Sequence, residues 1–263
     1  MTLIAGIDIG SRGTKIALID RGGKLRGWHI ARTKPPFEET VEAALAAALA
    51  TVGASRGDVG YLITTGFGRS SYPERDTQVT DISAGAFGAT AMFPKTRCVI
   101  DIGSQSSRAI HVDEIGRVKE FKSNDKCAAG AGGFVERAAR YIETTLEEVG
   151  ELSLAGEDPV TISSVCAVLA ESEIINHVSQ GRSVEDILRG VHNSLAERAI
   201  ALLKRVGIEP EVTLVGGMAR QRGMVRALSE MLQMPINIPE TPEIVNALGA
   251  ALLAKRRLER VAA

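Results

Sequence analysis

The sequence predicts an α/β protein built from two duplicated lobes, each with a mixed β-sheet flanked by helices. Three observations support this fold class. Short apolar segments of strand type alternate with longer segments whose apolar residues have helical spacing. A strand–turn–strand unit at residues 7–20 recurs at residues 100–113, with a constant offset of 93 residues. Hydrophobic residues make up 44% of the 263 residues, which is enough to fill substantial cores.

Composition and charge exclude several classes of protein. Lys and Arg number 31 against 32 Asp and Glu, and this balance argues against a protein that binds nucleic acid by neutralising its phosphates. The longest apolar segments fall short of the roughly 18 residues that a membrane span needs, and residues 1–10 lack the pattern of a signal peptide. Three cysteines in a chain of this size indicate a reducing compartment. We therefore expect a cytoplasmic protein that binds neither nucleic acid nor membranes.

The first part of the chain predicts a strand meander followed by alternating helices and strands. Gly-rich turns separate the first three strands, and Pro35-Pro36 ends the meander. An Ala-rich segment then has apolar residues at helical spacing. The expected strands are 3–9, 15–20, 24–31 and 59–64, and the expected helices are 37–52 and 81–93.

The second part of the chain repeats this alternation. Two strands are expected on either side of the tight turn within 100–113, the first of them beginning at 99, and a third at 118–122. A short strand-like segment at 160–163 precedes a predicted helix. A final strand pair at 212–215 and 236–238 is interleaved with helices. The expected helices are 134–142, 165–179, 183–205 (as one helix or two), 223–232 and 245–259.

The repeated unit carries the first sign of function. Six of its fourteen positions are identical, among them the pairs Asp8/Asp101 and Gly10/Gly103. Each copy places an Asp at the end of an apolar strand, followed by a tight Gly-Ser turn and a second strand. Ordinary β-turns with Asp and Gly would look the same singly, but two matching copies favour two turns that face one shared site.

These turns have the chemistry of a site for a magnesium polyphosphate. Backbone N–H groups and hydroxyls can bind phosphate oxygens, and Asp8 and Asp101 can hold Mg²⁺ through its waters. Neither a P-loop string nor a dinucleotide fingerprint is present, because the first turn leads into a strand. The candidate phosphate-binding residues are Gly10, Ser11, Arg12, Gly13, Thr14 and Lys15 in the first turn, and Gly103, Ser104, Ser106 and Ser107 in the second.

A third Gly-rich turn follows the predicted strand 212–215. Gly216, Gly217 and Met218 stand between this strand and a helix, and glycine there lets a flat ring approach the backbone closely. The turn could therefore seat the adenosine of ATP. A plain strand–helix connection is the alternative.

Together, Asp8-Ile9-Gly10, Asp101-Ile102-Gly103 and Gly216-Gly217 resemble the two phosphate motifs and the adenosine motif of the actin, Hsp70 and sugar-kinase ATPases. Two longer strings that each contain a cysteine are more specific. They are Asn124-Asp125-Lys126-Cys127-Ala128-Ala129-Gly130 and, at 163–173, Ser-Ser-Val-Cys-Ala-Val-Leu-Ala-Glu-Ser-Glu. They are similar to the activators of 2-hydroxyacyl-CoA dehydratases and to the ATPase subunits of ATP-dependent benzoyl-CoA reductases. The resemblance covers nearly the whole chain.

The resemblance implies an actin/Hsp70-like (ribonuclease H-like) fold with one lobe at 1–94, on which the C-terminal helix 245–263 packs back, and a second at 95–244. It also implies a [4Fe–4S] cluster that bridges two subunits, each of which supplies two cysteines. Cys127 and Cys166 are the matching positions here, in the second lobe. Because this chain has no CxxC run, two chains giving two ligands each would complete the site. Cys98, beside an apolar strand, is expected in the core.

Further roles follow from the same resemblance. Gln105 falls on the second phosphate turn, where it could sense the terminal phosphate or orient the attacking water. Ser104 and Ser106 depart from the activators' usual Gly and acidic residue there. Gly130, Gly132 and Gly133 are expected to bring the Cys127 loop close to the nucleotide. The catalytic residues would then be Asp8, Asp101 and Gln105, and the cofactors ATP or ADP, Mg²⁺ and the cluster.

The function implied is an ATP-driven electron donor. Reduced ferredoxin or flavodoxin would load the cluster, and ATP hydrolysis would drive one electron to an iron–sulfur dehydratase or reductase. The second subunit could be another copy of this chain or a related one. Two other functions remain open: a small-molecule kinase that phosphorylates a sugar or acid, and a non-redox regulatory ATPase in which the cysteines only pack.

Overall fold

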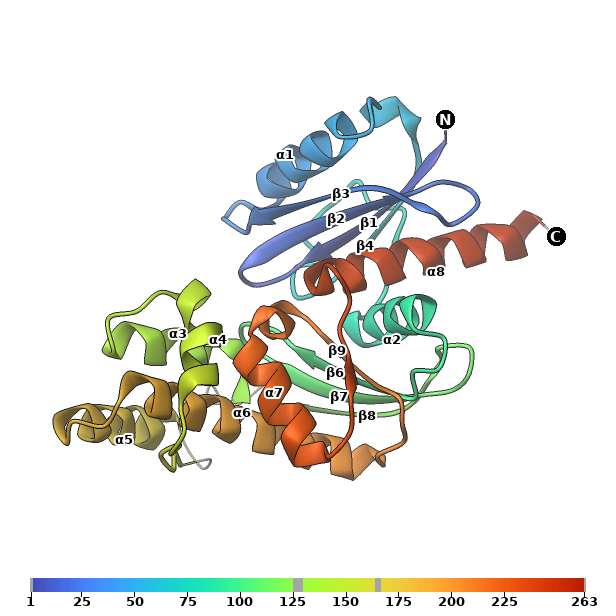
Figure 1. The fold of residues 1–263 in the computed structure, drawn as a ribbon. Coiled ribbons are helices and arrows are strands. Elements are labelled where there is room, and N and C mark those ends of the chain that lie inside the picture. The colour runs from blue at the N-terminus through green and yellow to red at the C-terminus, as the bar shows by residue number, and fades with distance from the viewer. Residues whose placement is uncertain (1, 125–129, 164–166, 263) are drawn as a thin grey trace. The chain divides into compact units, whose positions relative to one another are not determined.

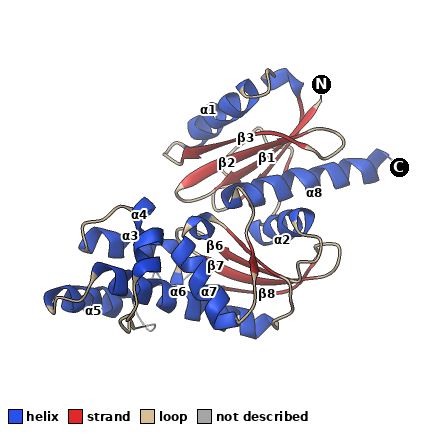
Figure 2. Ribbon diagram, in the orientation of Figure 1, coloured by secondary structure: helices blue, strands red, loops and turns tan. Residues whose placement is uncertain are grey.

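The computed structural model describes residues 2–124, 130–163 and 167–262 of the chain. It divides into two compact units, each described by itself (Figure 1). The first unit comprises Met1–Lys95, Val112–Val118 and Glu243–Ala263, and the second comprises Thr96–His111 and Lys119–Pro242. Each unit contains a five-stranded sheet with helices packed on it (Figure 2).

The sheet of the first unit is mixed. Its central strand β1 pairs antiparallel with β2 and parallel with β4, and β2 pairs antiparallel with β3. The short edge strand β5 pairs parallel with β4. In order across the sheet, the strands are β3 (Leu25–Arg32), β2 (Gly13–Ile19), β1 (Leu3–Ile9), β4 (Val59–Thr65) and β5 (Thr77–Gln78).

Helices cover both faces of this sheet because β1 is apolar on both. Alternate side chains of a strand point to opposite faces. Ile7 and its odd-numbered neighbours pack with α1 (Phe37–Ala50), whereas Ile4 packs with α8 (Val245–Ala262) and α2 (Asp81–Met92). The Ala- and Gly-rich helices α2 and α8 approach closely, since a Cβ on Gly249 would lie 1.9 Å from the Ala84 carbonyl oxygen.

The second unit repeats the sheet of the first. Its central strand β6 pairs antiparallel with β7 and parallel with β9, and β9 pairs parallel with β10. This is the order and direction seen around β1, so the predicted duplication is confirmed. In order across the sheet, the strands are β8 (Val118–Asn124), β7 (Ser107–Val112), β6 (Cys98–Ile102), β9 (Val212–Val215) and β10 (Ile236–Asn237).

Five helices of the second unit share one core with its sheet. Residues 184–206 form one uninterrupted helix whose buried face runs along its whole length. Helix α4 has no counterpart among the sequence-based elements, although Thr145 and Glu148 form a capping box at its start. The helices are α3 (Gly132–Tyr141), α4 (Leu146–Ala155), α5 (Ala167–Ser179), α6 (Val184–Val206) and α7 (Arg222–Leu232).

The strand predicted at 160–163 is wrong. Val160 and Ile162 are buried, as a strand pattern suggests, but they pack in the helical core. The Val160 N–H donates to the Asp186 carbonyl of α6 at 3.2 Å, and the Ser163 N–H donates to the Glu173 side chain of α5. Acceptors on α6 and α5 therefore bind the backbone N–H groups that a neighbouring strand would otherwise bind.

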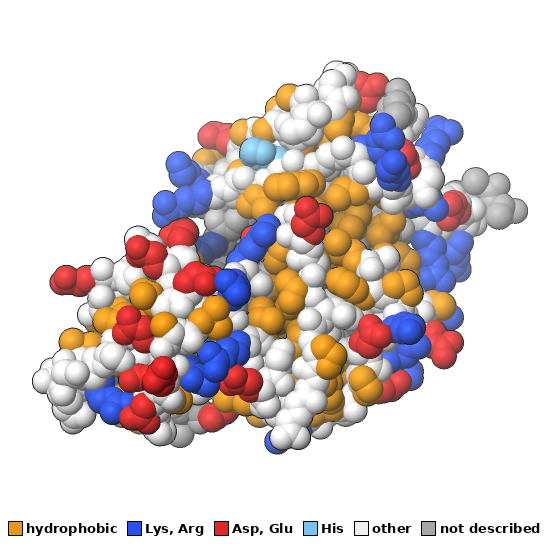
Figure 3. All heavy atoms as spheres, in the orientation of Figure 1, with side chains coloured by type: hydrophobic (Ala, Val, Ile, Leu, Met, Phe, Trp, Pro, Cys, Tyr) orange, Lys and Arg blue, Asp and Glu red, His pale blue; other side chains and the backbone are white. Residues whose placement is uncertain are grey.

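The surface carries both signs of charge. Figure 3 shows Lys and Arg side chains interspersed with Asp and Glu on the face drawn, in keeping with the net charge of −1. Within the described ranges, each helix is too short or too polar to qualify as a membrane span.

One buried histidine links three helices of the second unit. His192 of α6 is completely buried, and its Nδ1 lies 2.8 Å from the Ser153 Oγ of α4. A Cβ on Gly223 of α7 would lie 2.6 Å from the same nitrogen, so glycine is required there. Burial lowers the pKa of His192 from 6.5 to about 4.

This depressed pKa predicts acid sensitivity. Between pH 6.5 and 4 the unfolded chain binds a proton at His192 that the folded chain does not, so stability falls as the pH drops through this window. The contribution amounts to about 2 kcal/mol between pH 7 and pH 5. We would measure the free energy of unfolding by urea for wild type and His192→Gln at pH 7 and pH 5. The decrease from pH 7 to pH 5 should be smaller in the variant. Equal losses would show that His192 titrates normally in the fold.

Candidate functional site

The first turn joins β1 to β2 and holds a partly buried ion pair. Asp8, 5% exposed, sits one residue before the end of β1, and its cross-strand neighbour Lys15 donates from Nζ to Asp8 Oδ2 at 3.0 Å. The turn closes through a bond from the Gly10 N–H to the Gly13 carbonyl at 3.1 Å. A carboxylate offers the oxygen atoms that Mg²⁺ and its bound waters prefer.

The hydroxyls of this turn differ in their availability. Thr14 is buried, and its Oγ1 lies 3.0 Å from the Thr33 hydroxyl, which in turn donates to the Gly10 carbonyl at 2.8 Å. Thr14 therefore braces the turn against Thr33, the residue that follows β3. Ser11 is half-buried and Arg12 is exposed, so the tip of the turn is the part accessible to a ligand.

Sequence reasoning missed the loop that follows β4. Thr65 pairs with Asp8 in the parallel register, and its buried hydroxyl has no hydrogen-bond partner within the described residues. Gly66 has a φ of +87°, and a Cβ there would lie 2.2 Å from Asp8 Oδ1. The string Thr65-Gly66-Phe67-Gly68 was the available signal, but its proximity to Asp8 depends on a long-range strand pairing.

The second turn, in the other unit, repeats the charge arrangement of the first. Asp101, 3% exposed, sits one residue before the end of β6, and Arg108 Nη1 lies 3.8 Å from its Oδ2. The turn closes through a bond from the Gly103 N–H to the Ser106 carbonyl at 2.9 Å. Gln105 lies exposed at its tip, whereas the Ser107 hydroxyl is buried and donates to the Gly130 carbonyl.

Three Gly-containing segments of the second unit converge at this turn. The Gly132 and Gly133 N–H groups donate to the Gly103 and Ser104 carbonyls at 2.9 and 2.8 Å. A Cβ on Gly132 would lie 3.0 Å from Met218 Sδ, and one on Gly216, where φ is +85°, would lie 2.7 Å from Asp101 Oδ1. The proposed phosphate turn, the start of α3 and the proposed adenosine turn are therefore in contact, with Gly217 opening the short helix Gly217–Arg220.

This convergence predicts a strict requirement for glycine at position 133. A methyl group there would lie 2.9 Å from the Ser104 carbonyl that Gly133 already binds, so the turn or α3 must shift. We expect Gly133→Ala to weaken binding of MgADP about tenfold or more, measured by isothermal titration calorimetry. Gly57→Ala is the matched control, since its methyl group would meet only the Ser55 Oγ at 3.9 Å. Equal affinity in Gly133→Ala would show that the contact is dispensable.

Two of the three cysteines lie outside the described residues. These are Cys127 and Cys166, the predicted cluster ligands. Cys98 is described and is buried, as expected; its Sγ donates to the Gly207 carbonyl at 3.3 Å and accepts from the Glu209 N–H at 3.4 Å. Burial raises the pKa of Cys98, which keeps it protonated. In the described part of the chain, the His, Cys, Asp and Glu side chains form no group of three suited to a metal.

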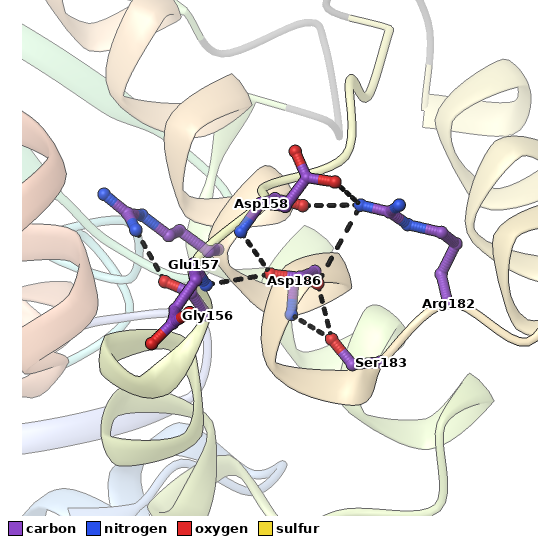
Figure 4. A network of polar contacts seen from close by, with 7 residues as sticks. Gly156, Glu157, Asp158, Arg182, Ser183 and Asp186 are labelled. Atoms are coloured by element: carbon purple, nitrogen blue, oxygen red, sulfur yellow. Dashed lines mark hydrogen bonds and ion pairs between the residues drawn. The ribbon is translucent and has the colours of Figure 1, made fainter.

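A polar network joins Glu157, Asp158 and Arg182 to the start of α6 (Figure 4). Asp186 Oδ1 accepts from the Glu157 and Asp158 N–H groups at 3.0 and 2.8 Å. Arg182, which follows α5, donates to Asp158 Oδ2 at 2.8 Å and lies 3.8 Å from Asp186 Oδ2. Hydrogen bonds, first that of Ser183, hold the pKa of Asp186 below its usual value. Asp158, which precedes α5 in the chain, and Arg182, which follows it, are therefore joined to the start of α6 by one polar network.

The protein has two duplicated mixed sheets, and in each the central strand carries an Asp near its end and leads into a Gly-Ser turn. These features define a nucleotide-binding ATPase of the actin/Hsp70-like class. Within that class, this chain belongs to the BadF/BadG/BcrA/BcrD ATPase family, whose model matches residues 5–254.

Relatives and a solved structure agree with this assignment. The chain is 42% identical over 202 residues to the 2-hydroxyisocaproyl-CoA dehydratase activator of Clostridioides difficile, covering 77% of this chain and 76% of the relative. It is 38% identical over 274 residues to one of the subunits of the benzoyl-CoA reductase of Thauera aromatica, covering 100% and 96%. The structure of the Clostridium difficile activator with bound ADPNP superposes with a TM-score of 0.93, at 36% identity, over 99% of this chain and 97% of that one.

Proposed function

We propose that this protein is an ATP-hydrolysing activator that carries a [4Fe–4S] cluster and passes a low-potential electron to a 2-hydroxyacyl-CoA dehydratase or a benzoyl-CoA reductase. The observation that carries the proposal is the chain-wide similarity to proteins named as dehydratase activators and as part of a benzoyl-CoA reductase. The sequence strings around Cys127 and Cys166 support the proposed iron–sulfur cluster and the electron transfer. Reduced ferredoxin or flavodoxin would be the electron donor.

The proposed nucleotide chemistry depends on the two phosphate turns, which follow Asp8 and Asp101. Bound Mg²⁺ would neutralise charge on the phosphates, and Asp8 and Asp101 would hold its waters. Both carboxylates are buried, and a cationic side chain lies 3.0 Å from Asp8 and 3.8 Å from Asp101. Backbone N–H groups at the turn tips would bind phosphate oxygens, and the exposed Gln105 would orient the attacking water. The glycines at 216 and 217, with Met218, would receive the adenosine.

The donor set of the chain fits a cluster shared between two subunits. Cys98 is buried, hydrogen-bonded and protonated, so two cysteines per chain are left as ligands. Four thiolates then require two chains. A bound [4Fe–4S] cluster would supply storage and transfer of single electrons.

The surface of α5 supports a second subunit. This helix begins at Ala167, directly after Cys166, and its Val168 and Leu169 side chains are 68% and 53% exposed. Ile175 and Val178 of the same helix are also exposed. Apolar side chains clustered on one helix are typical of a surface that another chain covers.

Anaerobic purification tests the proposal. We expect a brown dimer with about two iron atoms per chain, the visible absorption of a [4Fe–4S] cluster, and ATPase activity that depends on Mg²⁺. Electron transfer should be measured as ATP-dependent activation of a dehydratase or reductase partner. A colourless, iron-free protein after anaerobic reconstitution would overturn the proposal. If its ATPase activity also required a sugar or acid substrate, a kinase would be the better assignment.

A further inference from the structure

The first helical turn of α3 depends on the second phosphate turn. Helix α3 has Ala131 at its N-cap, with no side chain that caps it. Its first two N–H groups, those of Gly132 and Gly133, instead donate to the carbonyls of Gly103 and Ser104. These N–H groups have no partner inside a helix, so the turn takes the place of a cap. A shift of the turn must therefore move or loosen the start of α3.

The side chain of Arg137 connects this region to α5. Arg137 lies four residues after Gly133 on the same face of α3. Its Nη1 is 3.8 Å, and the Ser104 Oγ 3.9 Å, from the position that a Cβ on Gly133 would occupy. Its Nε donates to Glu171 Oε1 on α5. One edge of the guanidinium is thus bound to α5, and its Nη1 lies beside Gly133, whose N–H binds the phosphate turn.

Glu171 is the point at which α3 holds α5. Besides the bond from Arg137, its Oε2 accepts the hydroxyl of Tyr141, at the end of α3, at 3.1 Å. Both partners are partly exposed: the Arg137 side chain is 34% exposed and that of Glu171 21%. An ion pair with this exposure contributes little to stability, but it can be exchanged readily for another partner.

The other side of α5 is fixed to the segment before Cys166. Glu173 accepts the Ser163 N–H, and the Ser163 carbonyl accepts from Arg198 Nη2 of α6 at 3.2 Å. Helix α5 therefore has two sets of attachments: Glu173 to the chain that leads to Cys166, and Glu171 to the helix capped by the phosphate turn.

We propose that the Arg137–Glu171 pair couples occupation of the second phosphate turn to the position of α5. A polyphosphate at this turn offers the guanidinium a second anionic partner, and charge-assisted bonds from Arg to phosphate are strong. Arg137 then weakens its hold on Glu171, and α5 is released from α3. This inference rests on the proposed function, both for nucleotide at the second phosphate turn and for the role of Cys166.

Hydrogen exchange on the anaerobically purified protein tests the coupling. Wild type is compared without nucleotide and with saturating Mg²⁺ and ADPNP. We expect nucleotide to slow exchange at residues 103–106 and to speed exchange in residues 167–179 at least threefold. In Glu171→Gln and in Arg137→Gln, exchange in α5 should already be fast without nucleotide and should change by less than 1.5-fold on addition, while residues 103–106 still respond.

Two further variants separate coupling from a general weakening of the helices. Arg140→Gln removes the pair with Glu136 at 2.9 Å on the same helix, and α5 should respond to nucleotide as in wild type. Glu171→Asp keeps the charge and should restore part of the response. An α5 response in Glu171→Gln equal to that of wild type would overturn the proposal, as would a wild-type α5 that ignores nucleotide. Iron content is read separately, so failure of the redox assignment would leave this outcome interpretable.

Discussion

Asp101→Asn is expected to lower the ATPase rate about 100-fold or more while leaving iron content and the fold unchanged. Asn preserves the shape of the side chain but removes the negative charge and one strong acceptor for a metal-bound water. Loss of one preorganised polar group in an active site typically costs between 10²- and 10³-fold in rate. Because Asp101 is 3% exposed and lies 3.8 Å from Arg108, the lost charge cannot be replaced readily by solvent.

The matched control is Asp113→Asn, at the other end of the same hairpin. Asp113 Oδ1 accepts from the Ile115 and Arg117 N–H groups at 3.0 and 2.8 Å, so its role is to order a surface turn. Initial ATPase rates at saturating Mg²⁺ and ATP should be close to wild type in this variant. Turnover in Asp101→Asn within threefold of wild type would show that the metal carboxylate lies elsewhere, and Asp8 would be the next candidate.

The repeat explains why the sheets could be predicted and some connections could not. Residues 7–20 and 100–113 contain both strands and the turn of each hairpin, so local sequence determines that part of the topology. The short strand β5 and the helix α4 have weaker patterns, and α4 buries only Val149, Gly150 and Ser153. Apolar alternation at 160–163 indicated a strand because burial against helices produces the same pattern.

The candidate site shows the same division between local and long-range information. The glycines at 132, 133 and 216 could be selected from the sequence because close backbone contacts exclude a Cβ. The bracing of Thr14 by Thr33 and the placement of Thr65 beside Asp8 depend on the β2–β3 and β1–β4 pairings. Side-chain partners that arise from strand register are not encoded in any short motif, which is why both were missed.

Cys127→Ser and Cys166→Ser should each abolish the iron signal and electron transfer to the partner, with MgADP affinity within about twofold of wild type. Serine is a poor ligand for iron in a cluster that thiolates normally hold. The described residues that line the second phosphate turn include no cysteine, so nucleotide binding should persist. Iron content, visible absorption and electron paramagnetic resonance of the dithionite-reduced protein measure the first effect, and calorimetry measures the second.

Cys98→Ser distinguishes ligands from packing residues within the same chain. Cys98 is buried, and its Sγ binds the backbone of Gly207 and Glu209, so serine there should cost about 1 kcal/mol of stability. Its iron content should equal that of wild type. If Cys127→Ser and Cys166→Ser behaved like Cys98→Ser, with iron and partner activation intact, the cysteines would only pack and a regulatory ATPase would be favoured. Loss of iron in the first two alone would instead require a second chain to complete the four thiolates, which sedimentation of the wild-type protein should detect as a dimer.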